Sequence, residues 1–314
     1  MRSDPGATKT QPSQPSDDAE KSSAFTALGM RAEADPIAPG LHVVATPIGN
    51  LRDITLRAIA TLAAADAVIA EDTRVSRHLL AHYGVTTPLV AYHEHNAAAM
   101  RPQLLARLAE GAALALISDA GTPLVSDPGY KLVAEALAAG IPVTSAPGPS
   151  AVLAALVVAG LPTDRFFFEG FLPPKSAARR ARINQLAAVP ATLVFFESPR
   201  RLVETLTDLA AELGDRPAAV ARELTKFYET TRRGPLEELA AHFAAQASPK
   251  GEIVVLVGPP KAAAPVADAD LDRLLGDAIE RLSVKDAAAA VSAQTGAPRR
   301  QVYARALTLA GLRR

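Results

Sequence analysis

Five ionisable side chains stand where acid–base chemistry could act on a bound substrate. Glu71 and Asp72 directly follow a short apolar run, and Asp127 lies in a loop of small residues. Glu223 and Lys226 belong to the charged segment RELTK. A carboxylate, or an amine whose pKa is lowered, can take a proton from a hydroxyl that must act as a nucleophile. These five residues are the candidate catalytic bases, and the sequence favours none of them.

The same two charged segments also have ordinary structural interpretations. Glu71 and Asp72 could complement the dipole at the start of a helix. Residues 222–226 could form ion pairs along a surface edge, where such pairs add little stability. From the residues alone, the chemical and the structural interpretations stay equally open.

Three loops of small residues follow predicted strands. They are PIGN at 47–50, SDAGTPLVSDP at 118–128 and PGPS at 147–150. Small residues let a ligand approach the backbone closely, and free loop N–H groups can hold a carboxylate or a phosphate. Because open α/β sheets bind ligands at the carboxyl ends of their strands, we expect the three loops to face one crevice. The alternative for each loop is a turn whose Ser or Asp caps the next helix.

Missing motifs make several kinds of chemistry improbable. The chain has no G-x-G-x-x-G fingerprint, no P-loop and no G-x-S-x-G elbow, which disfavours a nicotinamide, a nucleotide triphosphate or a hydrolase triad. It has no cysteine, and its six histidines lack metal-ligand spacing, so we expect no metal site. Pocket-shaping loops without a reactive nucleophile favour a transferase whose cosubstrate is already activated.

Composition limits the partners and the location. The 314 residues are 49% hydrophobic, and the formal net charge is zero, so contact with a polyanion would need a local basic patch. No apolar run is long enough to span a membrane, and no signal-peptide core stands at the N-terminus. We therefore expect a cytoplasmic protein with no membrane partner.

The chain divides into four parts by its composition and by its pattern of apolar and polar residues. Residues 1–38, rich in Pro, Ser, Asp, Gln and Ala, are expected to form a disordered extension. Residues 39–160 alternate apolar runs with helical patterns five times, which is typical of an α/β domain with a parallel sheet. Residues 161–260 are expected to form a second α/β domain with a mixed sheet. Residues 268–314 are expected to form a small helical C-terminal domain.

The predicted strands of the first domain are 41–46, 67–70, 88–92, 114–117 and 141–145, and those of the second are 166–171, 191–196, 218–224, 227–232 and 251–257. In the helical tail, segments 284–292 and 299–309 flank a Gly296 turn with helix–turn–helix spacing. A small bundle packed on the body is an equally good interpretation of that spacing.

Eight motifs in order resemble one known family. They are VATPIGNLRDIT, EDTR, SDAGTPLVSDPG, PGPSA, FEGFLP, FFESP, RELTKFYE and KGEIVVLV. Over residues 41–314 the chain resembles the tetrapyrrole-methylase-like class of S-adenosylmethionine-dependent methyltransferases. SDAGTPLVSDPG and RELTKFYE are the specific motifs, whereas PGPS alone would be weak.

The resemblance implies two α/β domains with S-adenosyl-L-methionine bound in the cleft between them, and a homodimer. It assigns cofactor binding to Pro47, Ser118, Asp119, Gly121, Thr122, Val125, Ser150, Ala151, Phe196, Leu224 and Ile253. Two positions depart from the family pattern. Thr122 stands where the family often has Asp, and Arg200 stands where a His is expected after the ESP element.

The members that the motifs most resemble act on RNA. The resemblance implies 2′-O-methylation of a cytidine ribose in 16S rRNA of the small ribosomal subunit. An RNA substrate would need cations against its phosphates. The candidates are Arg74, Arg77, Arg179, Arg200 and Lys226, with Arg180 and Arg182 beside them.

Two other functions compete with that interpretation. The first is a methyltransferase of the same fold that acts on a small tetrapyrrole-like substrate, which would not require the helical tail or the Arg-rich helix. The second is a non-catalytic ribosome assembly factor that keeps the cleft as a relic. Cofactor binding without methyl transfer to RNA would favour the second alternative.

Overall fold

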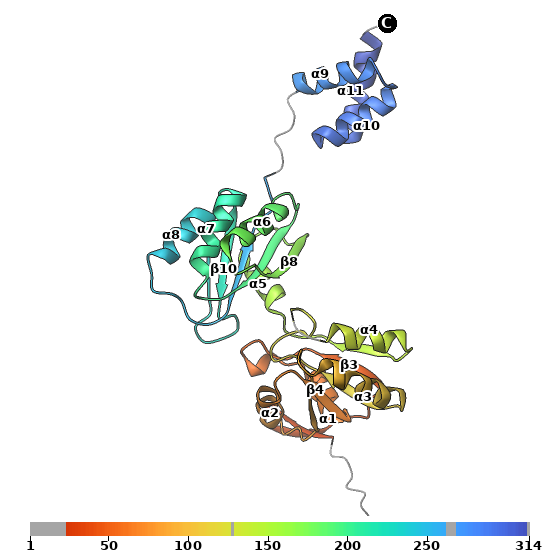
Figure 1. Ribbon diagram of the computed structural model, residues 1–314, viewed down its shortest axis with the longest axis vertical. Coiled ribbons are helices and arrows are strands. Elements are labelled where there is room, and N and C mark those ends of the chain that lie inside the picture. The colour runs from red at the N-terminus through yellow and green to blue at the C-terminus, as the bar shows by residue number, and fades with distance from the viewer. Residues whose placement is uncertain (1–22, 127–128, 262–267, 313–314) are drawn as a thin grey trace, which may run out of the picture.

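The computed structural model describes residues 23–126, 129–261 and 268–312 (Figure 1). Its first domain is built on a parallel five-stranded sheet with the order β5-β4-β6-β3-β7. The strands are β3 (Gly40–Val44), β4 (Ala67–Ala70), β5 (Leu89–Ala91), β6 (Ala113–Leu116) and β7 (Val143–Ala146). The helices between them are α1 (Leu56–Ala64), α2 (Thr73–His82), α3 (Ala97–Ala109) and α4 (Tyr130–Ala138). The predicted parallel α/β domain is confirmed.

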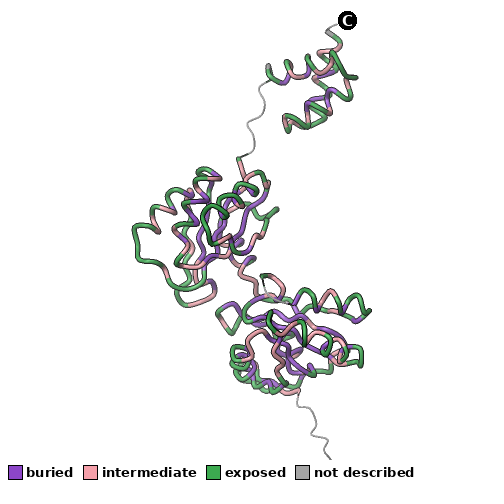
Figure 2. The backbone as a smooth tube through the Cα atoms, in the orientation of Figure 1, coloured by how far each residue is buried: buried purple, intermediate pink, exposed green. Residues whose placement is uncertain are grey.

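The helices of this domain cover both faces of the sheet because its central strands β4 and β6 are apolar and buried on both sides. Along β4, Val68 and Ala70 pack with α1 and α2, whereas Ala67 and Ile69 pack with α3 and α4. Successive side chains of a strand point to opposite faces, so one apolar run serves two cores. Figure 2 shows the buried residues gathered along the strands.

The second domain has a mixed five-stranded sheet with the order β11-β10-β12-β9-β8. The strands are β8 (Phe166–Phe171), β9 (Thr192–Glu197), β10 (Pro217–Arg222), β11 (Thr230–Pro235) and β12 (Ile253–Val257). Only β8 and β9 are parallel, and the other pairs are antiparallel. Helices α6 (Ser176–Leu186), α7 (Leu202–Leu213) and α8 (Leu236–Ala244) pack on one face. The predicted mixed sheet is confirmed.

Helix α5 (Ala151–Ala159) covers the other face of the second sheet. Its residues Val152, Ala155 and Leu156 share a core with Val194 and Leu256. The sequence prediction placed residues 151–160 in the first domain, whereas the structure packs this helix on the second. The helix is apolar all round, so its sequence could not show which sheet it covers.

Residues 24–33 form a hairpin that the sequence prediction assigned to the disordered extension 1–38. Strand β1 (Ala24–Ala27) pairs with β2 (Met30–Glu33), Phe25 is buried in the first core, and Thr26 N donates to Tyr83 O at 2.7 Å. Strand β2 is fully exposed and so lacks the apolar alternation that reveals a strand. Ala34, also within the predicted extension, is buried in the first core, whereas residues 1–22 lie outside the described part of the chain.

The C-terminal part contains α9 (Asp268–Ile279), α10 (Val284–Thr295) and α11 (Arg299–Leu312). Leu275, Val291 and Val302 are buried in a core of its own. Gly296 ends α10 in the left-handed conformation, which confirms the predicted turn between two helices. In the described residues no helix is both long enough and apolar enough to cross a membrane.

Candidate functional site

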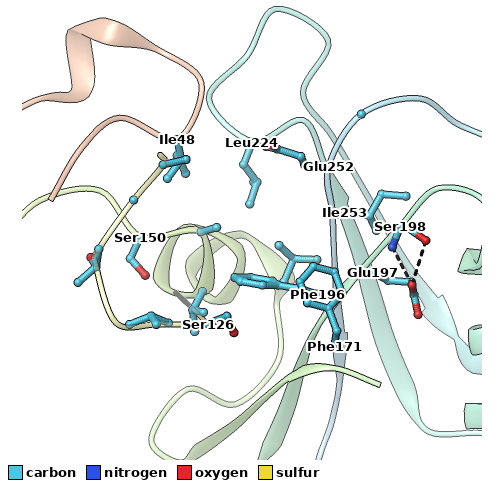
Figure 3. A pocket seen from close by; sticks show the side chains of 18 of the residues that line it. Ile48, Ser126, Ser150, Phe171, Phe196, Glu197, Ser198, Leu224, Glu252 and Ile253 are labelled. Atoms are coloured by element: carbon cyan, nitrogen blue, oxygen red, sulfur yellow. Dashed lines mark hydrogen bonds between the residues drawn. The ribbon is translucent and has the colours of Figure 1, made fainter. Parts of the chain in front are cut away.

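A cavity of about 400 Å³ lies where the strand-end loops of the first domain meet the second sheet (Figure 3). That volume is within the range of pockets that bind small molecules. The first domain and α5 contribute Ile48, Ala120, Gly121, Thr122, Val125, Ser126, Ser150, Ala151 and Val152. The second domain contributes Phe171, Phe196, Glu197, Ser198, Pro199, Leu224, Gly251, Glu252, Ile253 and Val254.

The loops of the first domain are tied to one another through backbone groups. Thr46 and Gly121 exchange backbone hydrogen bonds of 2.9 and 3.1 Å, which joins the PIGN loop to the central loop. The Thr122 hydroxyl donates to Pro149 O at 3.0 Å, which joins the central loop to PGPS. The three loops therefore face one crevice, as the strand ends predicted.

An aromatic cluster lines the second-domain side. The ring centroids of Phe168 and Phe171 lie 4.9 and 5.7 Å from that of Phe196, and both pairs meet edge to face. The register of β8 against β9 shifts between Phe168 and Gly170. A bulge of this kind re-aims side chains. Figure 3 shows Phe171 and Phe196 side by side at the cavity.

Glu197 lines the same side but is fully engaged in the fold. Its carboxylate accepts from Ser198 N at 2.7 Å and from the Thr205 hydroxyl at 2.6 Å, and it lies 3.5 Å from the Arg201 guanidinium. A buried carboxylate with these partners holds the start of α7 in place. Arg200, where the family pattern has His, is exposed beside the pocket residue Pro199.

The motif RELTKFYE forms a tight turn closed by an ion-pair clamp. The Glu223 carboxylate accepts from Lys226 Nζ at 2.8 Å and from Glu252 N at 3.0 Å. Lys226 Nζ also lies 3.1 Å from the Glu252 carboxylate. Gly251 has φ of +95°, and a Cβ there would overlap the Glu223 carboxyl, so any other residue would have to displace that carboxylate. The clamp fixes Leu224 and Glu252 at the edge of the cavity.

Lys226 also reaches across to the first domain. A Cβ built on Gly49 would lie 2.5 Å from Lys226 Cγ, so the lysine stem packs directly on the PIGN loop. Gly49 has φ of +146° and its missing side chain leaves room for the lysine. One side chain thus links the second-domain clamp to the first-domain loop above the cavity.

This clamp changes the interpretation of two candidate bases. Burial by itself lowers the pKa of Lys226, but its hydrogen bonds to Glu223 and Glu252 outweigh burial and raise the pKa. The hydrogen bond from Lys226 lowers the pKa of Glu223. A lysine needs a lowered pKa and a carboxylate a raised one to act as a base near neutral pH. Both residues therefore serve better as the clamp than as a base.

The pKa values of two other candidate bases, Asp72 and Glu71, are shifted in opposite directions. The hydrogen bond from the Arg74 side chain lowers the pKa of Asp72 to about 2. Burial raises the pKa of Glu71, and the nearby Asp119 charge raises it further. Asp72 N donates to the Asp119 carboxylate at 3.0 Å, which sets these residues side by side at the strand ends. Asp127 lies outside the described residues.

The cofactor residues implied by the resemblance fall into two groups. Those at the cavity are Gly121, Thr122, Val125, Ser150, Ala151, Phe196, Leu224 and Ile253. Pro47, Ser118 and Asp119 do not line it, although each is adjacent in sequence to a lining residue or loop. Pro47 and Ser118 are buried and support the loops.

The sequence reasoning missed lining residues that come from the second domain. The main ones are Phe171, Ser198, Gly251 and Glu252. These residues belong to the motifs FEGF, ESP and KGE, so the sequence carries a signal for them. Their places at the cavity depend on the bulge in β8 and on the clamp, which the sequence does not show.

The structure contradicts one proposed RNA contact. Arg179 is 1% exposed, and its Nε donates to the Asp208 carboxylate at 2.6 Å. Loss of one partner of such a buried pair typically costs about 3–5 kcal/mol. Arg179 therefore holds α6 against α7 and cannot reach a phosphate. Arg180 and Arg182 are also paired, with Glu212 and Glu169 respectively.

The remaining candidate RNA-binding residues differ in their exposure and in their ion pairs. Arg77 and Arg200 are exposed, and Arg74 is exposed but paired with Asp72 at 2.7 Å. Lys226 is held in the clamp. In the described residues, no group of three or more His, Asp or Glu is arranged to hold a metal ion.

The cavity fits a nucleoside-sized methyl donor such as S-adenosylmethionine. Its surface is mainly apolar, with Val125, Phe196, Leu224 and Ile253 available for an adenine ring. The hydroxyls of the lining residues Ser126, Ser150 and Ser198 offer polar partners. Among the residues that line it, the charged side chains are the carboxylates Glu197 and Glu252, which suits a cationic sulfonium.

Comparison with known proteins agrees with this geometry. Residues 40–240 match the family described as tetrapyrrole (corrin/porphyrin) methylases, and residues 265–310 match the RsmI C-terminal HTH domain. The chain therefore belongs to the tetrapyrrole methylase family. It is a methyltransferase that uses S-adenosylmethionine as its methyl donor. Within that class it groups with relatives named ribosomal RNA small subunit methyltransferase I.

Two of these relatives illustrate the similarity. A protein of Mesorhizobium japonicum with that name is 56% identical over 277 residues, covering 88% of this chain and 94% of the relative. One of Pseudomonas aeruginosa with the same name is 47% identical over 276 residues, covering 86% of this chain and 98% of the relative.

Solved structures share the fold at lower identity. A diphthine synthase matches with a TM-score of 0.56 and 18% identity over 69% of this chain and 89% of that one. The cobalt precorrin-4 methyltransferase CbiF matches with a TM-score of 0.52 and 19% identity over 69% of this chain and 94% of that one. At such identities the likeness shows the fold alone.

The clamp yields a prediction about donor binding. Gly251→Ala should displace Glu223 and with it Lys226 and Leu224, so we expect S-adenosylmethionine to bind about tenfold more weakly, or about 1.4 kcal/mol, in calorimetry. Gly140→Ala is the matched control, because Gly140 also has a positive φ, +73°, but nothing lies within 4 Å of its Cβ position.

Both variants carry the strain of alanine at positive φ, about 1–2 kcal/mol. Only Gly251→Ala should lose donor affinity. Equal affinity in the two variants would show that the clamp does not shape the pocket.

Proposed function

We propose that this enzyme transfers the methyl group to the 2′-oxygen of a cytidine ribose in 16S rRNA, on the small ribosomal subunit in the cytoplasm. The observation that carries the RNA substrate is the identity of 47–56% to relatives named for the small subunit rRNA, over 86–88% of this chain. The helical C-terminal domain, which a small substrate would not require, supports the same choice.

The residues that would hold the donor come from both domains. The loop 120–122 and the start of α5 would contact it from one side, and Phe196, Leu224 and Ile253 from the other. S-adenosylmethionine supplies a methyl group on a sulfonium, which is already a good leaving group. What the chain must add is alignment with the attacking oxygen and exclusion of water.

We assign proton removal from the ribose hydroxyl to Glu71. It follows β4 at the carboxyl edge of the sheet, and its neighbour Asp72 is bonded to Asp119, which precedes the pocket residue Ala120. Among the candidate bases in the described residues, Glu71 is the carboxylate whose pKa is raised. A carboxylate with a raised pKa is a stronger base than an ordinary one.

Glu71→Gln tests this assignment through two readouts. Methyl transfer at pH 7.5 should fall by about 10²–10⁴-fold, the usual contribution of a positioned base, while donor affinity stays unchanged. Because the folded-state pKa of Glu71 is raised, its stabilising contribution is full below pH 4.5 and is lost as the pH rises. The variant should therefore unfold at higher urea than the wild type at pH 7.5, and at the same urea at pH 4.

Glu110→Gln serves as the control, because Glu110 is an exposed carboxylate at the end of α3. It should change neither readout. Full activity of Glu71→Gln would contradict the assignment of the base.

The proposed function is tested by transfer of labelled methyl from S-adenosylmethionine to small subunits that lack the modification, with free rRNA alongside. We expect label on a 2′-O-methylcytidine, located by nuclease mapping. Label on a base atom or on a different nucleotide would overturn the proposed position. Donor binding without any labelled RNA would favour the assembly factor, and transfer to a tetrapyrrole would favour the small-molecule enzyme.

A further inference from the structure

Two aromatic side chains are exposed at the tip of the turn between β10 and β11. Phe227 is 93% exposed and Tyr228 is 70% exposed. Their ring centroids lie 5.0 Å apart and their planes meet at 88°. Apolar area of this size is costly to leave in water, so a ligand or partner that covers it would be favoured.

The turn that carries the two rings is rigid. Thr225 N donates to the Glu229 carboxylate at 2.7 Å, and Glu229 N donates to Lys226 O at 3.1 Å. Glu223 and Thr225 both have positive φ, of 54° and 66°. A backbone held in such conformations presents its side chains in a fixed direction. The sequence predicted a strand at 227–232, but β11 begins only at Thr230, because this turn occupies the residues before it.

The turn is continuous with the donor pocket. Leu224 lines the cavity, and Lys226, the residue before Phe227, packs on the PIGN loop at its edge. The aromatic tip therefore stands next to the edge of the donor pocket.

The hairpin is basic although the whole chain is neutral. Residues 222–233 carry four cationic side chains, Arg222, Lys226, Arg232 and Arg233, against two carboxylates, Glu223 and Glu229. Arg222 Nε donates to the Thr230 hydroxyl at 3.2 Å, and in the described part of the chain neither Arg222 nor Arg232 is paired with a carboxylate.

These two arginines line a second cavity of about 470 Å³ behind the turn. Its other walls are Thr230, Thr231, His242, Phe243, Gln246, Ala247 and Pro249. Hydroxyl, guanidinium and amide groups of this kind bind phosphate oxygens. The cavity and the aromatic tip belong to one hairpin, so a single strand could contact both.

We propose that the β10–β11 hairpin binds the substrate RNA strand beside the target nucleotide. One ring of the perpendicular Phe227–Tyr228 pair stacks on an unpaired base while the other contacts the edge of that base, and the cavity with Arg222 and Arg232 receives a phosphate of the same strand. The proposal rests on the proposed function, since it deepens the RNA contact of that site. Stacking on aromatic side chains is the usual way in which proteins hold single-stranded bases.

The test uses the full-length enzyme and an RNA strand that contains the target cytidine with 2-aminopurine beside it. Stacking on an aromatic ring quenches the fluorescence of 2-aminopurine. We expect quenching with the wild type and its loss in Phe227→Ala/Tyr228→Ala, with RNA affinity weakened by about tenfold or more. Phe227→Trp/Tyr228→Phe should restore both.

The control is Phe166→Ala, which removes a 44% exposed Phe from β8 at the opposite edge of the same sheet. It should leave the quenching intact. Calorimetry should show the same S-adenosylmethionine affinity in every variant. Arg232→Glu should weaken RNA binding most at low salt, because the contact is electrostatic.

Unchanged quenching and affinity in the double alanine variant would overturn the proposal. So would a shift of that variant from dimer to monomer in ultracentrifugation with RNA affinity retained, which would assign the two rings to a second copy of the chain. A wild type that quenches but transfers no methyl would instead overturn the proposed function and leave the hairpin contact standing.

Discussion

The ion-pair clamp of Glu223, Lys226 and Glu252 is the constraint on which the site depends. The Glu223 carboxylate accepts from Lys226 Nζ and from the backbone N–H of Glu252. The absence of a side chain at Gly251 makes room for this carboxylate. The stem of the same lysine packs on Gly49 of the first domain. The clamp thus fixes the edge of the cavity, joins the two domains above it and sets the direction of the aromatic turn. Exposed ion pairs add little stability, so its importance lies in geometry.

The cavity forms because one helix, α5, connects the two sheets: it starts at a loop of the first and packs on the second. Helix α5 begins at Ser150, in a loop of the first domain, and its apolar residues pack under the second sheet. Each strand of that sheet alternates its side chains, so Val194 faces α5 while Leu193 faces α6 and α7. The donor pocket therefore lies between the two domains, where the packing of α5 holds one side and the Glu223–Lys226–Glu252 clamp holds the other.

Much of the fold could be predicted from the sequence because it rests on local patterns. Apolar runs that end in small residues gave the strands of both sheets, and Ser150 and Gly296 marked helix ends. The predictions that failed concern features that depend on contacts between residues far apart in the sequence. The sequence of α6 shows an arginine-rich helix, but only the carboxylate of Asp208 makes Arg179 a buried structural residue. The sequence of residues 24–33 also does not show that they form a hairpin, which is hydrogen-bonded to Tyr83. For Glu71 and Lys226, residue type suggested a base, whereas the neighbours decide which direction each pKa moves.

The central claim is that one donor molecule is held by both domains at the seam. Hydrogen–deuterium exchange with and without S-adenosylhomocysteine tests it most directly, because it reports on each loop separately. Slower exchange is predicted together in residues 120–122 and 151–153 of the loops and α5, and in 224–226 and 252–254 of the second domain. Protection confined to one of these two sets would contradict a shared site, since a ligand at the seam must cover both.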